Sequence, residues 1–225
     1  MREVDAGPQI APLLEDRSAL VVVTAARALT MIGDGRVAHQ VVCAVAPRQK
    51  SHCLPSWAAI ESLCAFSEPV GDVVIEALQH PDPTVRYVAA TVIDARPLLQ
   101  ASFAVRQRLP LEDDIRTLVA LLAALGRVGS TDDLTMVSAF AQHPDEHASL
   151  AAVEALESLG SDVAVIALRD LLNDPRLRVA ERAAIALAEL GPAGRAPLLV
   201  AAADEGWAGR PSRYALELVV LQEEH

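Results

Sequence analysis

The chain contains few aromatic residues. They make up 3% of its 225 residues, whereas hydrophobic side chains, mostly alanine, leucine and valine, account for 52%. Sandwiches and barrels use strands rich in aromatic and β-branched residues, while small side chains favour close packing between helices. The composition therefore predicts an all-α protein.

The chain is also poor in basic charge. Lysine and arginine total 19 against 30 acidic residues, which gives a net charge of −11, and Lys50 is the only lysine. A field of this sign repels phosphate backbones and anionic lipid surfaces. We therefore expect no nucleic-acid partner, and any protein partner is expected to be basic. The strong preference for arginine over lysine is typical of a GC-rich genome.

Cysteine is scarce, and its spacing excludes a disulfide framework. The three cysteines are Cys43, Cys53 and Cys64, an odd number without paired spacing, which indicates a reducing compartment. They form no C-x-x-C pair of the kind that binds zinc. Cys43 and Cys64 are expected to be buried small hydrophobic residues. These features predict a cytoplasmic protein.

Long apolar runs are absent as well. The most apolar stretch, residues 19–32, contains Arg27 and is shorter than the roughly twenty apolar residues of a bilayer-spanning helix. The first residues carry acidic groups and proline, where a signal peptide would have a basic start and an apolar run. We expect no membrane span in this segment, while an anchor upstream of it stays open.

No recognisable catalytic motif occurs in the sequence. It lacks G-x-S-x-G, a phosphate-binding loop and P-C-x-x-C. His143 and His147 have the i,i+4 spacing of metal ligands, but no second motif completes a site. We therefore predict no catalytic residue, no cofactor-binding residue and no metal ligand.

The chain does contain a segment that recurs about every thirty-one residues. Each copy has a turn with proline and aspartate, a helix with two adjacent small residues, and a leucine-rich end that often closes on glycine. The clearest copies are residues 80–95, 143–160 and 173–191. A period in this range indicates supersecondary units that bury their apolar faces only by stacking on one another.

This period predicts seven helical hairpins in a single domain, residues 1–225. The second helices are expected near residues 19–32, 56–66, 84–95, 114–125, 147–159, 177–190 and 211–221. Aspartates in the turns are expected to cap these helices, and glycines to end them in the left-handed conformation. The aspartates are Asp82, Asp145 and Asp174, and the glycines are Gly33, Gly129, Gly160 and Gly191. Residues 96–114 form either a joint between two halves or a first helix (98–108) followed by a capping turn.

The turn, the alanine pair and the leucine-glycine end resemble HEAT repeats, of the short bacterial type called HEAT-like or bilin-lyase-like. Residues 82–95, DPTVRYVAATVIDA, and residues 174–191 follow the pattern D-P-x-V-R-x-x-A-A-x-A-L-x-x-L-G. The resemblance implies a right-handed α-solenoid of about seven hairpins whose second helices line a concave face. It also implies aspartate–arginine ladders between adjacent repeats, and a role in interaction more than in chemistry.

The concave face is where we expect a partner to bind. Alignment of the repeats places Glu61, Glu154 and Glu217 in one column, which predicts either an acidic groove for a basic peptide or helix or simply solvated positions. Aromatic residues recur near the start of second helices, as interface anchors or as core. The predicted partner-binding residues are Trp57, Glu61, Arg86, Tyr87, Glu154, Glu157, Arg182, Glu189, Arg213, Tyr214 and Glu217.

We therefore predict a non-enzymatic scaffold for protein–protein interaction. A bilin-lyase-like or chaperone-like protein that handles a cofactor is the alternative, and a HEAT-like protein that processes nucleic acid is a weaker one. The sequence leaves the partner, any small ligand and the state of self-association open.

Overall fold

The computed structural model describes residues 6–33, 35–46, 53–66 and 70–223, and within these residues it contains helices and no strand. The all-α prediction is thus confirmed. The chain divides into two compact units, residues 1–124 and 125–225, which are described separately. The prediction of a single domain over residues 1–225 remains a prediction, and the division falls after the segment 96–114.

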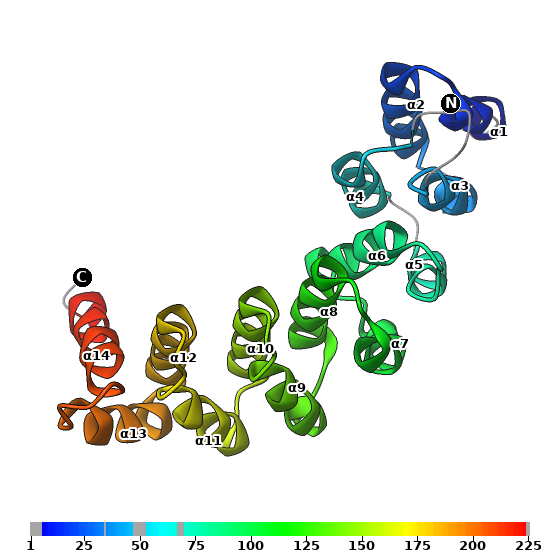
Figure 1. The fold of residues 1–225 in the computed structure, drawn as a ribbon. Coiled ribbons are helices and arrows are strands. Elements are labelled where there is room, and N and C mark those ends of the chain that lie inside the picture. Colours follow the sequence, from blue (N-terminus) through cyan, green and yellow to red (C-terminus); the bar gives the residue numbers. More distant parts are fainter. Residues whose placement is uncertain (1–5, 34, 47–52, 67–69, 224–225) are drawn as a thin grey trace. The chain divides into compact units, whose positions relative to one another are not determined.

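Unit 1 is built from short first helices and longer second helices (Figure 1). Its elements are α1 (Gly7–Ile10), η2 (Ala11–Glu15), α2 (Ala19–Ile32), η3 (Gly35–Val37), α3 (Ala38–Cys43), α4 (Ser56–Ala65), α5 (Gly71–Ala77), α6 (Pro83–Ala95), η4 (Leu99–Ala101), α7 (Ser102–Arg108), η5 (Leu109–Leu111) and α8 (Ile115–Val128), which ends in unit 2. The second helices pack in a row, α2 on α4 and α4 on α6, while α3 packs on α5. The result is two layers of helices.

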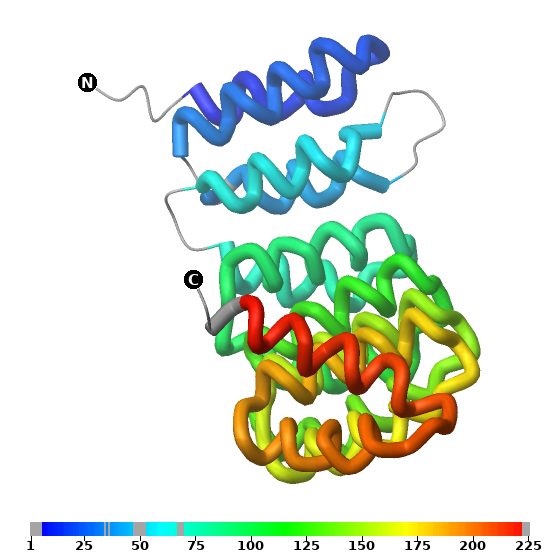
Figure 2. The backbone as a smooth tube through the Cα atoms, turned by 90° about the vertical axis from the view of Figure 1, so that its left-hand side faces the viewer, coloured from blue at the N-terminus to red at the C-terminus, as the bar shows by residue number. Residues whose placement is uncertain are grey.

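Unit 2 repeats this arrangement more regularly. Its elements are η6 (Thr131–Asp133), α9 (Leu134–Ala141), α10 (Glu146–Leu159), α11 (Asp162–Leu171), α12 (Leu177–Glu189), α13 (Pro192–Ala202) and α14 (Gly209–Glu223). The first helices form one layer, with α9 on α11 and α11 on α13, and the second helices α10, α12 and α14 pack in sequence to form the other. Figure 2 shows the paired tubes of successive hairpins within each unit. The predicted stack of helical hairpins is confirmed.

The second helices lie within a few residues of their predicted bounds, because their capping signals are local. The carboxylate of Asp82 accepts a hydrogen bond from the amide of Thr84 at 2.7 Å, and that of Asp145 accepts from the amide of His147 at 2.9 Å. In the segment 96–114, α7 is an ordinary first helix. The carboxylate of Asp114 accepts from the amide of Thr117 at 2.9 Å, so the capping-turn interpretation holds there.

The glycines that end helices are only partly as predicted. Gly33, Gly160 and Gly191 have positive φ angles of 74°, 50° and 74°, which is the left-handed conformation that glycine adopts without steric cost. Gly129 does not have a positive φ, so its predicted left-handed stop is wrong. A Cβ at that position would instead lie 2.9 Å from Oδ2 of Asp133, so the glycine is needed for close packing.

The alanine pairs of the repeat lie in the core. In unit 2, Ala151 and Ala152 are 5% and 0% exposed, and Ala183 and Ala184 are both 0% exposed. Small side chains at these positions let neighbouring second helices approach closely while leucines fill the space around them. None of the described helices has the length and hydropathy that crossing a bilayer requires.

Candidate functional site

In unit 1, the second helices α2 and α4 present three of the charged and aromatic side chains on their exposed side. Nη2 of Arg27 lies 3.4 Å from Oε2 of Glu61, and both side chains are more than half exposed. The guanidinium carbon of Arg27 is 5.7 Å from the ring centroid of Trp57, which is 55% exposed. A cation over an indole face at this distance is attracted to it. Trp57 and Glu61 are therefore accessible to a partner and share one arginine.

Tyr87, on α6, is half-buried and contacts a second arginine. The guanidinium carbon of Arg116 lies 4.5 Å from the centroid of its ring. The sequence left the aromatic residues open between core and surface. Tyr87 is neither a fully buried core residue nor a fully exposed surface residue, because it is half-buried and Arg116 lies over its ring.

Arg86 is placed differently from its neighbours in the predicted set. It is 7% exposed, and its Nε and Nη2 donate to the two carboxylate oxygens of Glu112, each at 2.7 Å. Its Nη1 donates to the carbonyl oxygens of His80 and Pro81 at 2.8 Å. Every guanidinium nitrogen thus has a partner inside unit 1. The residue links α6 to the turn before α8, and we leave it out of the partner-binding surface.

In unit 2, four of the predicted residues form one cluster on α10 and α12. Nε of Arg182 lies 3.6 Å from Oε1 of Glu154, and its Nη2 donates to Oε2 of Glu157. Glu157 also shares a hydrogen bond with Glu189. Two carboxyl groups therefore contact one guanidinium, and Glu189 joins the cluster through Glu157, an arrangement that alignment alone did not indicate.

The cluster raises the pKa of Glu157 to about 7. Burial is the largest cause, since the side chain is 18% exposed, and the hydrogen bond to Glu189 is the second because it favours the protonated form. The positive charge of Arg182 acts in the opposite direction. At mildly acidic pH, Glu157 is therefore protonated.

This shift predicts that unit 2 loses stability as the pH rises through about 7. A carboxyl group with a pKa above its unfolded value of 4.5 stabilises the fold fully below pH 4.5 and loses that contribution as the pH passes its folded pKa. After a discount for partial exposure we expect a loss of about 1 to 2 kcal/mol between pH 5 and pH 8. Urea unfolding at the two pH values measures it. Glu157→Gln should lack this difference while Glu154→Gln retains it; equal pH dependence in all three proteins would contradict the assignment.

On α14 the predicted residues lie beside an apolar surface. Tyr214 is 48% exposed and Glu217 is exposed one turn further on. Next to them Val220 and Leu221 are 54% and 57% exposed, and they line an open cavity of about 440 Å³ together with Leu216 and Glu217. The sequence analysis did not predict this apolar surface. The run of aliphatic residues at the end of the degenerate last repeat could have indicated it.

Arg213 is exposed but already bound to the backbone of its own unit. Its Nη1 donates to the carbonyl oxygen of Ala202 at 2.9 Å and to that of Asp204 at 3.2 Å. These bonds fix the start of α14 against the end of α13. The guanidinium of Arg213 thus has a structural role. That Arg213 also contacts a partner remains a prediction.

Comparison with known proteins identifies the repeat. A family model described as HEAT repeats matches residues 104–188. These residues run from α7 to α12, so the repeat in this part of the chain is a HEAT repeat. No curated protein matches its sequence.

Two of the solved structures that are similar to this chain illustrate the fold. One comes from the complex of CpcE and CpcF of phycocyanin lyase from Nostoc sp. PCC7120, with 18% identity and a TM-score of 0.51 over 94% of each chain. The other is an engineered protein with 20% identity and a TM-score of 0.53, covering 96% of this chain and 69% of that one. At these identities the likeness concerns the fold alone, which is the predicted HEAT-like α-solenoid.

Arginines join adjacent repeats, as the resemblance implied, but the acidic partner is not an aspartate. Arg178 on α12 pairs with Glu146 on α10 at 2.7 Å. Two further arginines reach the preceding repeat through backbone carbonyls: Arg96 donates to that of Leu63 at 3.2 Å, and Arg176 to that of His143 at 2.7 Å. In each case the arginine contacts the second helix of the preceding repeat or the turn next to that helix.

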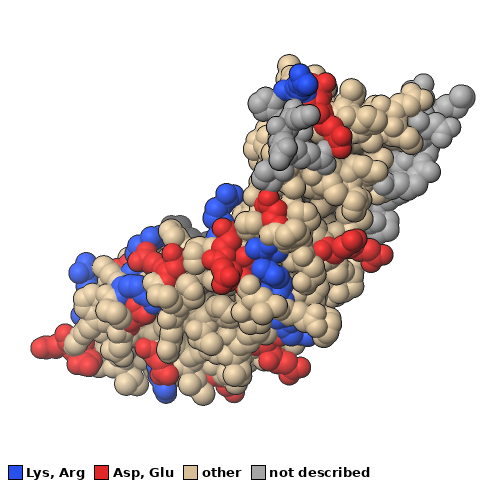
Figure 3. All heavy atoms as spheres, turned by 45° about the vertical axis from the view of Figure 1, so that its right-hand side comes forward, with Lys and Arg blue, Asp and Glu red and all other residues tan. Residues whose placement is uncertain are grey.

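These ion pairs place basic groups beside the carboxylates of the second helices in unit 2. Arg178 and Arg182 partly neutralise the carboxylates of α10, and on the face drawn in Figure 3 acidic and basic side chains lie side by side. The carboxylates of Glu154, Glu189 and Glu217 remain exposed. Among the described residues, no group of three histidine, cysteine, aspartate or glutamate side chains is arranged to hold a metal ion.

Proposed function

We propose that the chain is a non-enzymatic scaffold that binds a basic protein segment on the exposed side of α10, α12 and α14 in unit 2. This surface, the second-helix face, is defined by Glu154, Glu189, Tyr214, Glu217 and Val220. The observation that carries the proposal is that all five side chains are exposed on helices that pack in sequence. An aromatic and an aliphatic group lie there among carboxylates that are accessible to a partner.

The chemistry of this face suits an amphipathic helix with basic residues. Tyr214 and Val220 supply apolar area of the kind that anchors interfaces, and an apolar helix face docks in such a groove with its charged residues at the rim. The exposed carboxylates steer a basic partner during association and discriminate against acidic ones. A solved chain of this fold was found in the complex of CpcE and CpcF, which is a precedent for a protein partner but extends no lyase activity to this chain. We place the scaffold in a bacterial cytoplasm.

The proposal is tested by reversing charge on the second-helix face. We expect the triple variant Glu154→Lys, Glu189→Lys, Glu217→Lys to lose about tenfold or more in affinity for the partner, because like charges then oppose each other across the interface. Affinity capture with the native chain as bait, followed by titration of the captured protein, measures the effect. Circular dichroism checks that helicity is unchanged.

A matched control keeps the same change of net charge away from the face. Asp132→Lys, Asp170→Lys, Glu205→Lys alters three exposed carboxylates outside the second helices of unit 2. This variant should retain the partner. Equal retention by both triple variants would refute the second-helix face as the binding surface, and equal loss would show that only net charge matters.

A further inference from the structure

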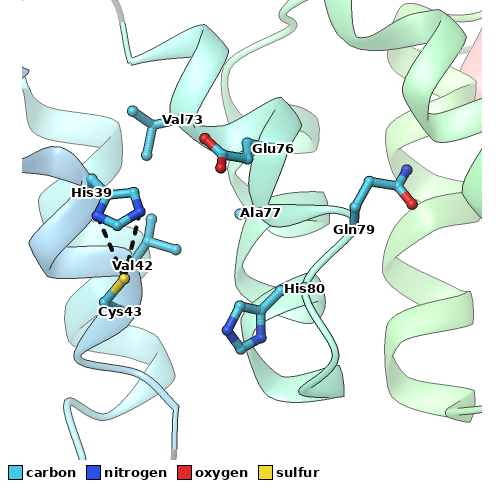
Figure 4. Close-up of a pocket in the computed structure, with 8 residues that line it drawn as sticks. All are labelled: His39, Val42, Cys43, Val73, Glu76, Ala77, Gln79 and His80. Atoms are coloured by element: carbon cyan, nitrogen blue, oxygen red, sulfur yellow. Dashed lines mark hydrogen bonds between the residues drawn. The ribbon is translucent and has the colours of Figure 1, made fainter.

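A cavity in unit 1 brings together a thiol and an imidazole that the function above does not use. It lies between α3 and α5, has a volume of about 230 Å³, and is lined by His39, Val42, Cys43, Val73, Glu76, Ala77, Gln79 and His80. Its walls are mainly aliphatic where Val42 and Ala77 are buried. Figure 4 shows His39 and Cys43 on the wall formed by α3, with Glu76 and His80 on the opposite side.

Cys43 is held against His39 by the helix itself. Residues four apart lie on the same side of a helix, and Sγ of Cys43 is 3.5 Å from Nδ1 and 3.7 Å from Nε2 of His39. Whichever ring nitrogen lacks the proton, it lies close enough to the sulfur to accept one. Because a thiolate is the form that attacks electrophiles, this contact favours reaction at Cys43.

Within the part of the chain that the structure describes, no histidine contact is recorded for the other two cysteines. Burial raises the pKa of the Cys64 thiol, and the positive charge of Arg96 offsets this effect only in part. Sγ of Cys53 donates to the carbonyl oxygen of Ala46 at 3.4 Å. The structure records no disulfide at any of the three cysteines and all three are half-buried, which corrects the prediction that Cys43 and Cys64 are buried in the core. Burial therefore does not by itself set Cys43 apart from the others; its neighbour His39 does.

We propose that Cys43 is a site of reversible thiolation by a low-molecular-weight aminothiol disulfide. His39 takes the proton from Sγ, and the thiolate attacks one sulfur of the disulfide. The new Sγ–S bond forms as the S–S bond of the reagent breaks, and the departing thiolate takes the proton from the imidazolium. Cys43 is oxidised to a mixed disulfide while one aminothiol is released in reduced form.

The lining of the cavity favours one kind of thiol. Its volume of about 230 Å³ leaves room for a small aminothiol beside Cys43. Of the described residues that line it, Glu76 supplies a carboxylate and none is lysine or arginine. The Nδ1 atom of His80 accepts the amide hydrogen of Asp82 at 3.0 Å, so this imidazole is held in place. An ammonium group of the ligand is therefore paired with Glu76.

Reaction of the native chain with three disulfides tests the site. The reagents are cystamine, which is cationic, 2-hydroxyethyl disulfide, which is neutral, and 3,3′-dithiodipropionate, which is anionic. Peptide mapping by mass spectrometry follows each cysteine separately. We expect Cys43 to form the mixed disulfide about tenfold faster than Cys53 and Cys64, and cystamine to react fastest. Equal rates at the three cysteines would overturn the proposal.

Two variants separate the roles of the lining residues. His39→Asn should slow Cys43 about tenfold toward every reagent, and Glu76→Gln should remove only the preference for cystamine. Unchanged helicity and unchanged rates at Cys53 and Cys64 show that unit 1 remains folded. If His39→Asn leaves the rate at Cys43 unaltered, the thiol is merely accessible and the proposal fails. This test involves unit 1 only, so it is independent of the second-helix face.

Discussion

Replacement of Glu112 by alanine is expected to destabilise unit 1 by about 3 to 5 kcal/mol. The side chain of Glu112 is 0% exposed and that of Arg86 is 8% exposed, so the variant leaves a buried guanidinium without its carboxylate. Nε of Arg108 and the amide of Asp114 also donate to Glu112, each at 3.1 Å. Removal of one acceptor therefore breaks several charge-assisted hydrogen bonds at once.

The urea midpoint of unfolding, followed by circular dichroism, measures this loss. A matched control is Asp170→Ala, which breaks the exposed pair with Arg169 and should cost less than about 1 kcal/mol. Similar losses in the two variants would contradict the structural role of Glu112. Burial alone would raise the pKa of Glu112, but the hydrogen bonds from Arg86 and its neighbours hold it below the ordinary value of 4.5. The native chain should accordingly lose this contribution as the pH falls below about 4.5.

Replacement of Gly194 by alanine is expected to destabilise unit 2 by about 2 to 3 kcal/mol. Gly194 lies in α13 against the backbone of Leu187 in α12, where an added Cβ would overlap the carbonyl oxygen and lie 2.8 Å from the carbonyl carbon. The obstacle is backbone, so no side-chain rotation relieves it. The sign is diagnostic, because alanine in place of glycine inside a helix ordinarily stabilises by about 1 kcal/mol.

Thermal and urea unfolding of the Gly194 variant test this prediction. The matched control is Gly206→Ala in the loop before α14, where the nearest atoms to an added Cβ belong to the flexible side chain of Asp204. That change should shift the free energy of unfolding by less than about 1 kcal/mol. A stabilised Gly194→Ala variant would show that α13 and α12 do not pack as closely as described.

The helices were predictable because the information that defines them is local. An aspartate two residues before a helical amide, a run of leucines at period 3.6 and a closing glycine lie within one repeat. The second helices accordingly begin and end near their predicted residues, such as 19–32 for α2. Gly129 was predicted wrongly because glycine signals both a left-handed turn and close packing, and the sequence does not distinguish them.

The site was harder to predict because its contacts connect different repeats. Arg86 was predicted to bind a partner and arginines in general to pair with aspartates of adjacent repeats, yet Arg86 pairs with Glu112, which lies 26 residues later in the segment 96–114. Glu157 and Glu189 occupy equivalent positions of adjacent repeats, so their proximity was available from the alignment. The contacts of Arg182 with Glu154 and Glu157 were not, because they depend on side-chain conformation. The i,i+4 spacing of His39 and Cys43 was also present in the sequence, in a degenerate repeat.

The two tryptophans of the sequence fall in different units, Trp57 in unit 1 and Trp207 in unit 2. Trp57 is 55% exposed beside Arg27, whereas the indole N–H of Trp207 donates to the carbonyl oxygen of Asp174 at 2.9 Å. Each unit therefore carries its own intrinsic fluorophore in a distinct environment. Single-tryptophan versions of the chain should report whether the two units melt together or one after the other, as stacked repeats can, without any attached label.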